Sequence, residues 1–128
     1  MEEVMEFLNK AGVYYIASVD SDGKPHLRPF GSRIIFNGKF YISMSFPKNV
    51  YYQVMDNPYV ELCVMGENRE WIRVAAKAVP TLDIDERSQI FEAMGRPGGV
   101  NVDSAMTFEL TEVTATIYTG NNSRTINW

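Results

Sequence analysis

The chain has 128 residues and a formal net charge of -4, with 45% hydrophobic and 22% charged residues. This length predicts a single domain, residues 1–128, with its own core. The acidic balance gives no support to nucleic-acid binding, one histidine and one cysteine exclude a multi-histidine or cysteine-cluster metal site, and no apolar run is long enough to span a membrane. The acidic, amphipathic N-terminus is unlike a signal peptide, so we expect a reduced cytoplasmic protein.

Apolar residues at helical spacing predict a first helix that ends at Gly12. The branched and aromatic run 13–19 predicts a strand, and residues 25–36 predict a second strand that Pro29 interrupts. A proline within a strand indicates a sheet edge or a bulge. The turn residues Asn37–Lys39 then predict a hairpin to a third strand.

The rest of the chain predicts further short elements. They are a strand at 40–44, a helix from Pro47 to Asn57, paired strands at 59–65 and 69–82, a helix capped by Asp83 and Glu86 and ended by glycines at 95–99, a strand at 106–120, and a tail at 121–128. Six short antiparallel strands with three helices indicate an α+β fold in which the strands close into a small barrel.

The junction between the third strand and the second helix is the strongest candidate site. Ser43 and Ser45 are two residues apart on a strand and therefore share a face, and Lys48 follows at the helix start. A cation there is unfavourable against the helix dipole unless an anion binds. Arg28, beside Pro29, is either a solvated strand residue or a fork for phosphate or carboxylate. These residues predict a phosphate cradle.

Other reactive side chains offer little chemistry. His26 is expected to face solvent without a carboxylate to orient it, and Cys63 to be an inert buried thiol. Trp71 is either core or a stacking surface, and Gly98 and Gly99 indicate a helix stop and not a phosphate-binding loop. No nucleophile–base pair, carboxylate pair or metal cluster emerges. Any chemistry would therefore belong to a bound organic cofactor.

The order of three segments carries a family resemblance. They are "YIASVDSDGKPHLRPF", "NGKFYISMSFPKNVYYQVMDNPYVEL" and "EWIRVAAKAV". Together they resemble the pyridoxamine 5'-phosphate oxidase-like family of FMN-binding split barrels, roughly over Val13 to Val79, and "FELTEVTATIYTG" is similar to the family's last barrel strand. The resemblance implies a six-stranded antiparallel split barrel. It also implies a homodimer that holds FMN at the subunit interface.

The resemblance also implies the residues that contact FMN. They are Arg28 at the phosphate, Pro29 and Phe30 beside the isoalloxazine, Ser43, Met44 and Ser45 at the ring and ribityl chain, Lys48 and Asn49 at the phosphate, and Trp71 on the long hairpin. The true oxidases have a longer C-terminal segment with an arginine–histidine product pocket, whereas this chain ends at "NNSRTINW". The resemblance therefore implies FMN binding and not pyridoxamine oxidation.

Two classes of function follow from this reading. The first is an FMN-dependent oxidoreductase or flavin reductase, which transfers a hydride from a nicotinamide nucleotide to an unknown small acceptor. The second is non-enzymatic, either a flavin carrier or a cofactor-free barrel used for interaction. Related barrels that use a deazaflavin coenzyme or haem are further alternatives.

Overall fold

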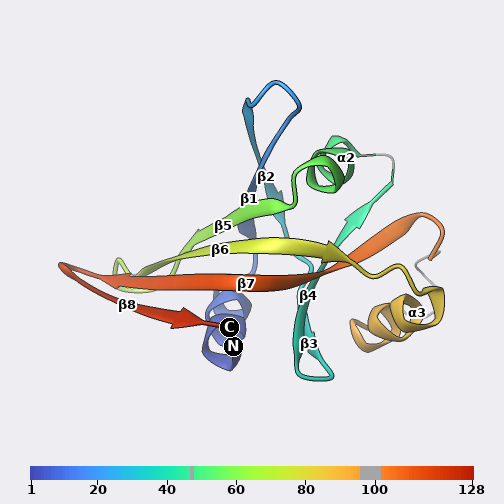
Figure 1. Ribbon diagram of the computed structural model, residues 1–128. Helices are drawn as coiled ribbons and strands as arrows, with labels where there is room; N and C mark the ends of the chain where they lie inside the picture. Colours follow the sequence, from blue (N-terminus) through green and yellow to red (C-terminus); the bar gives the residue numbers. More distant parts are fainter. Residues whose placement is uncertain (47, 96–101) are drawn as a thin grey trace.

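The structure is a computed structural model and describes residues 1–46, 48–95 and 102–128 (Figure 1). The helices and strands are α1 Glu2–Ala11, β1 Tyr14–Val19, β2 Pro25–Phe30, β3 Ile34–Phe36, β4 Lys39–Ser45, α2 Asn49–Asp56, β5 Tyr59–Met65, β6 Trp71–Pro80, α3 Ile84–Ala93, β7 Ala105–Thr119 and β8 Asn122–Asn127. Their strands form one antiparallel sheet in the order β2-β1-β5-β6-β7-β4-β3, and β8 pairs with β7. This is the α+β split-barrel fold that the sequence predicts.

Within the described residues the sheet has eight strands and not the predicted six. The predicted strand 25–36 is two strands, because β2 pairs with β1 whereas β3 turns away to pair with β4. The predicted tail at 121–128 contains β8, which lacks an apolar alternation of its own and is held by the edge of β7. As Pro29 indicates, β2 lies at the edge of the sheet.

Strand β7 is the longest strand, and two different strands, β4 and β8, pair with it along the same edge. Its first part, Ala105–Glu109, pairs with β4, and its second part pairs with β8. Between these parts Glu112 has a φ of 50°, and the register with β6 shifts between Ala75 and Lys77. Such a bulge bends the strand and increases its twist. The sheet therefore curls around its core, and β4 and β8 diverge from β7 in Figure 1.

The inward side chains of the strands and one face of α1 form the hydrophobic core. Val4 and Leu8 of α1 are buried against it, four residues apart on one helix face. The largest fully buried side chains include Tyr14, Phe40 and Phe108. None of the helices within the described ranges is long and apolar enough to cross a membrane.

The split in the barrel lies between β2 and β4, and Ser32 bridges it. The Ser32 hydroxyl accepts a hydrogen bond from the Ser43 N–H at 2.9 Å and donates to the Ser43 carbonyl at 3.1 Å. The Tyr14 hydroxyl donates to the Ser32 carbonyl at 2.6 Å. A single side chain therefore takes the place of a strand partner for Ser43. This closes the sheet beside the strand–helix junction.

Helix α3 begins as predicted, with Asp83 as its N-cap and a side-chain carboxylate that accepts from the Glu86 N–H at 2.9 Å. Replacing Asp83 with alanine leaves that N–H without its cap, and we expect the free energy of unfolding to fall by about 1 kcal/mol. Urea denaturation measures the change. Asp83→Asn, which keeps an acceptor oxygen, should lose only a small part of it. Equal losses for both variants would contradict the capping role. The predicted stop at Gly98 and Gly99 lies outside the described residues.

Candidate functional site

Helix α2 starts directly after β4, and its first turn carries no acidic residue. Lys48 is the N-cap, with extended backbone angles and no side-chain hydrogen bond to the helix, and Asn49 is the first helical residue. The Lys48 N–H donates to the Ser45 carbonyl at 3.3 Å, which holds the end of β4 against the helix start. The predicted start at Pro47 lies outside the described residues. The start of α2 therefore offers backbone N–H groups and a lysine, with no acidic residue in its first turn.

Arg28 lies at the side of α2 and bonds to uncharged groups. Its Nη1 donates to the Ser18 hydroxyl at 2.8 Å and to the Ile16 carbonyl at 3.3 Å, and its Nη2 donates to Gln53 Oε1 at 3.0 Å. Partial burial lowers the pKa of the guanidinium, which nevertheless keeps its charge at neutral pH. In the described part of the chain no carboxylate pairs with it. A half-buried cation of this kind can receive an external anion.

The two candidate phosphate contacts are Arg28 on β2 and the start of α2, and Gln53 of α2 connects them. Gln53, which bonds Arg28, follows Asn49 by four residues, so both side chains lie on the same face of α2. One helical turn rises about 5 Å. Arg28 therefore contacts α2 about one helical turn from Asn49, and Ser45 and Lys48 lie at the start of the same helix. That these four residues form one phosphate cradle stays a prediction.

The other predicted cofactor contacts are Ser43, Met44, Phe30 and Pro29, and their side chains do not all face one site. Ser43 is half-buried, and since Ser32 already bonds both of its backbone groups, only its side chain stays a candidate for cofactor contact. The Met44 side chain is 1% exposed and packs in the core, and Met44 pairs with Met106 of β7. Phe30 contacts the edge of Tyr14, whereas the exposed Pro29 points to the opposite face of β2.

Trp71 and Ser45 lie beside opposite ends of β7. It pairs with Tyr118 near the C-terminal end of β7, whereas Ser45 pairs with Ala105 at the N-terminal end. At about 3.3 Å per residue along a strand, these positions are tens of ångströms apart. Trp71 stacks on the Tyr118 ring at 4.1 Å, and the Arg73 guanidinium lies 5.2 Å from the Trp71 ring centre. It is a stacking surface and not a core residue.

The structure corrects two expectations about reactive residues. His26 faces solvent as expected, but it has a carboxylate partner, because its Nε2 lies 2.8 Å from Asp20 Oδ2 across the β1–β2 hairpin. This bond, together with backbone N–H groups from the turn, holds the pKa of Asp20 below its usual value. Cys63 is exposed and not buried, because β5 alternates and its outward positions face solvent. Desolvation still raises the pKa of the Cys63 thiol.

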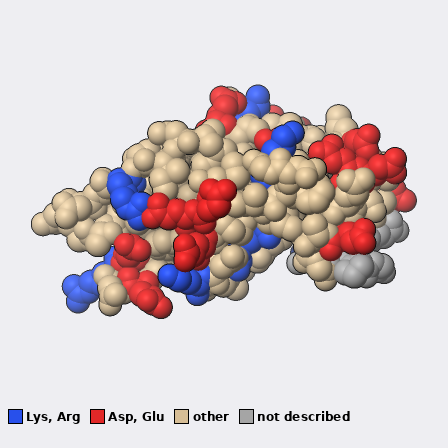
Figure 2. Space-filling view, turned by 90° about the horizontal axis from the view of Figure 1, so that it is seen from below, with Lys and Arg blue, Asp and Glu red and all other residues tan. Residues whose placement is uncertain are grey.

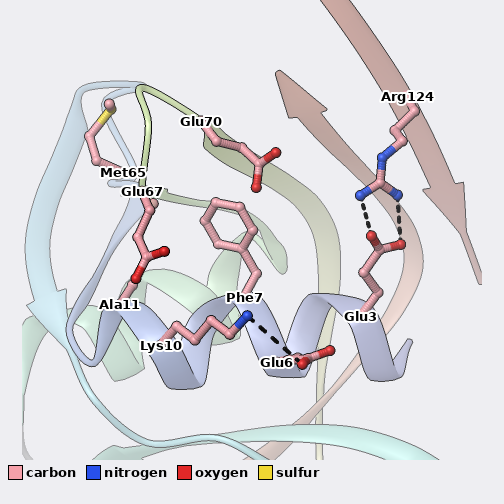
Figure 3. A pocket seen from close by; sticks show the side chains of 10 residues that line it. Glu3, Glu6, Phe7, Lys10, Ala11, Met65, Glu67, Glu70 and Arg124 are labelled. Atoms are coloured by element: carbon pink, nitrogen blue, oxygen red, sulfur yellow. Dashed lines mark hydrogen bonds and ion pairs between the residues drawn. The ribbon is translucent and has the colours of Figure 1, made fainter. Parts of the chain in front are cut away.

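A pocket of about 320 Å³ lies on another side of the barrel, between α1, the β5–β6 turn and β8 (Figure 3). Phe7 points into it, and four carboxylates line it: Glu3, Glu6, Glu67 and Glu70. Its two cations are already paired, Arg124 with Glu3 and Lys10 with Glu6. Figure 2, seen from below, shows carboxylates beside Lys and Arg over the left and middle of the view, and carboxylates gathered at the right-hand end, where α3 lies. Such surroundings repel a phosphate, so we place no flavin phosphate here.

Comparison with known proteins agrees with the fold. The pyridoxamine 5'-phosphate oxidase family model matches residues 1–115. A NimC/NimA family protein from Clostridium acetobutylicum has a TM-score of 0.89 and 27% identity, with 100% of this chain and 92% of that chain covered. A search of curated proteins found no match.

Two more distant structures share the fold alone. One is a pyridoxamine 5'-phosphate oxidase-related, FMN-binding protein from Nostoc punctiforme, with a TM-score of 0.69, 14% identity, and coverage of 99% of this chain and 96% of that chain. The other is HutZ, the haem storage protein of Vibrio cholerae, with a TM-score of 0.65, 19% identity, and coverage of 85% and 87%. The match over residues 1–115 decides the family: this chain belongs to the pyridoxamine 5'-phosphate oxidase family.

Proposed function

We propose that the protein binds FMN, with the phosphate held between Arg28 and the start of α2, and acts as an FMN-dependent oxidoreductase. The observation that carries the proposal is Arg28, a half-buried cation that bonds only neutral groups among the described residues and contacts α2, a helix whose first turn has no acidic residue and whose N-cap is Lys48. Charge-assisted bonds to a dianionic phosphate are the strong ones, and helix N-termini favour anions. The FMN-binding relative from Nostoc punctiforme is consistent with this use of the fold.

The residues assigned to this site bind and orient, and none is assigned a proton-transfer role. Bound FMN supplies the redox chemistry, since its ring accepts and returns a hydride. We propose a nicotinamide nucleotide as the hydride donor and an unidentified small molecule as the acceptor. The lone, reduced Cys63 fits a cytoplasmic location, which is part of the proposal.

We further propose a homodimer with the flavin at its interface. The outward side chains of four neighbouring strands form an apolar surface, here called the outer face: Tyr15, Leu27, Pro29, Cys63, Met65 and Trp71. Tyr15, Leu27 and Met65 are 48%, 69% and 60% exposed. The charges beside them, Glu61 and Arg73, neutralise each other at 3.1 Å. A second copy of this face would cover both surfaces. It would also place the partner's Trp71 at the interface that holds the proposed flavin.

Spectroscopy of purified protein tests the redox activity. We expect protein mixed with FMN to retain it through gel filtration, and anaerobic NADH or NADPH to bleach the flavin band. A nitroaromatic compound or a quinone should restore the band. Retained flavin that stays oxidised with both nucleotides would favour a flavin carrier. Retention of a deazaflavin coenzyme in preference to FMN would favour that related class.

Haem binding is the second candidate, because HutZ shares the fold. His26, the sole histidine, has its Nε2 engaged by Asp20 at the exposed hairpin, which disfavours its use as an iron ligand. We expect added haemin to give no sharp, saturable Soret band. If a stoichiometric band forms and His26→Ala abolishes it, haem replaces FMN as the proposed ligand.

A further inference from the structure

We propose that Ser18 and Gln53 are positioning residues that hold the Arg28 guanidinium with one edge free for two oxygens of a single phosphate. The inference rests on the proposed function, because the phosphate is that of FMN. It assigns a role to two residues that the sequence patterns did not single out. They come from β1 and α2, whereas Arg28 belongs to β2.

The hydrogen bonds of Arg28 define which donors remain. A guanidinium has five N–H donors in a planar fork. Both Nη1 donors are used, by the Ser18 hydroxyl at 2.8 Å and the Ile16 carbonyl at 3.3 Å, and one Nη2 donor is used by Gln53 Oε1 at 3.0 Å. The Nε donor and the second Nη2 donor have no acceptor among the described residues. These two lie on one edge of the fork, which is the geometry that binds two phosphate oxygens in parallel.

The other edge of the guanidinium is held in place because its acceptors, the Ser18 hydroxyl and Gln53 Oε1, are hydrogen-bonded to each other. The Ser18 hydroxyl donates to Gln53 Oε1 at 2.6 Å, so Arg28, Ser18 and Gln53 form a closed ring of hydrogen bonds. Ser18 is only 1% exposed, which keeps water from replacing it easily. Holding a donor in its binding orientation beforehand reduces the entropy lost on binding. The ring therefore sets the direction of the Arg28 fork and ties it to α2.

The acceptor at position 53 is an amide and not a carboxylate, and this preserves the charge of the site. A glutamate there would pair with Arg28 and cancel its attraction for phosphate. Gln53 thus orients the guanidinium without neutralising it. The distinction makes Gln53→Glu, which changes charge but hardly changes shape, the most informative substitution.

The experiment compares FMN with riboflavin, which lacks the phosphate, in wild type, Gln53→Leu, Gln53→Glu and the exposed α2 control Met55→Leu. We expect Gln53→Leu to weaken FMN binding about 5- to 10-fold and Gln53→Glu to weaken it further, because charge-assisted hydrogen bonds are lost. Riboflavin affinity should not change, and Met55→Leu should match wild type. General damage to the fold would weaken both ligands alike. Fluorescence titration gives both constants.

A second measurement observes the free edge directly. The Arg28 Nε–H gives an NMR signal that can be identified by its loss in Arg28→Lys. FMN should shift this signal in wild type, and the shift should be lost in Gln53→Leu. Bound FMN that leaves the signal unmoved, or unchanged FMN-to-riboflavin discrimination in both Gln53 variants, would overturn the inference while FMN binding stands.

Failure of the proposed function gives a different result. If wild type binds no FMN, inorganic pyrophosphate serves as the probe of the same edge. A saturable shift of the Arg28 Nε–H signal in wild type, lost in Gln53→Leu, would support the positioning role without the flavin. No shift with pyrophosphate in that case would overturn both proposals.

Discussion

Replacing Arg28 with alanine is expected to weaken FMN binding by about 1.5–3 kcal/mol, the usual range for a hydrogen bond to a charged group. The guanidinium is half-buried and bonded to no carboxylate in the described part of the chain, so little of its charge is cancelled before the phosphate arrives. Lys48→Ala should cause a loss in the same range, because it removes the cation at the start of α2. Isothermal titration calorimetry with FMN measures both changes.

Two controls, Lys24→Ala and riboflavin, distinguish a loss of phosphate contacts from a general loss of positive charge and from a folding defect. Lys24→Ala removes one positive charge from the exposed β1–β2 turn and should leave FMN affinity unchanged. Riboflavin should bind weakly to wild type and respond little to any of the three substitutions. Arg28→Ala or Lys48→Ala protein with wild-type FMN affinity would remove the basis for the phosphate site. A parallel loss of riboflavin affinity would indicate a folding defect instead.

A charged residue on the outer face is expected to separate the proposed dimer. Leu27→Asp and Tyr15→Asp each place an uncompensated carboxylate twice in a symmetric interface, at a cost of about 3 kcal/mol or more. The variants should sediment as monomers at micromolar concentration and release FMN. FMN should be released because the proposed site binds it in the dimer, so that dissociation of the dimer lowers the affinity for FMN.

The matched control for this face is Leu82→Asp. Leu82 is 72% exposed but lies at the entry to α3, beyond the end of β6, and not on the outer face. This variant should remain dimeric and keep its flavin. Wild-type protein that sediments as a monomer of 14.6 kDa and still retains FMN would refute the interface-site proposal. Dimeric Leu27→Asp protein with normal FMN content would instead place the interface on another surface.

Local patterns in the sequence predicted most of the elements. The capping residues at Asp83, the break at Asn57–Pro58 and the edge position of Pro29 depend on neighbours within a few residues, and each is as predicted in the structure. The strand–helix junction at Ser45 to Asn49 was likewise predicted from residues adjacent in the chain. Its function as a phosphate cradle stays a prediction.

The tertiary structure decided which distant segments of the chain pair with or contact one another. The C-terminal segment forms β8 because β7 bends and offers it an edge, and its own residues carry no strand pattern. Arg28 contacts Gln53 and Ser18 because α2 packs against β1, and Trp71 lies apart from Ser45 because the two residues pair with opposite ends of the long strand β7. Hydrophobic periodicity reports which face a residue presents, but it carries no information about the partner across the sheet. The sequence by itself therefore determined most of the elements and the candidate cations, and the long-range pairing of strands determined β8 and which side chains meet.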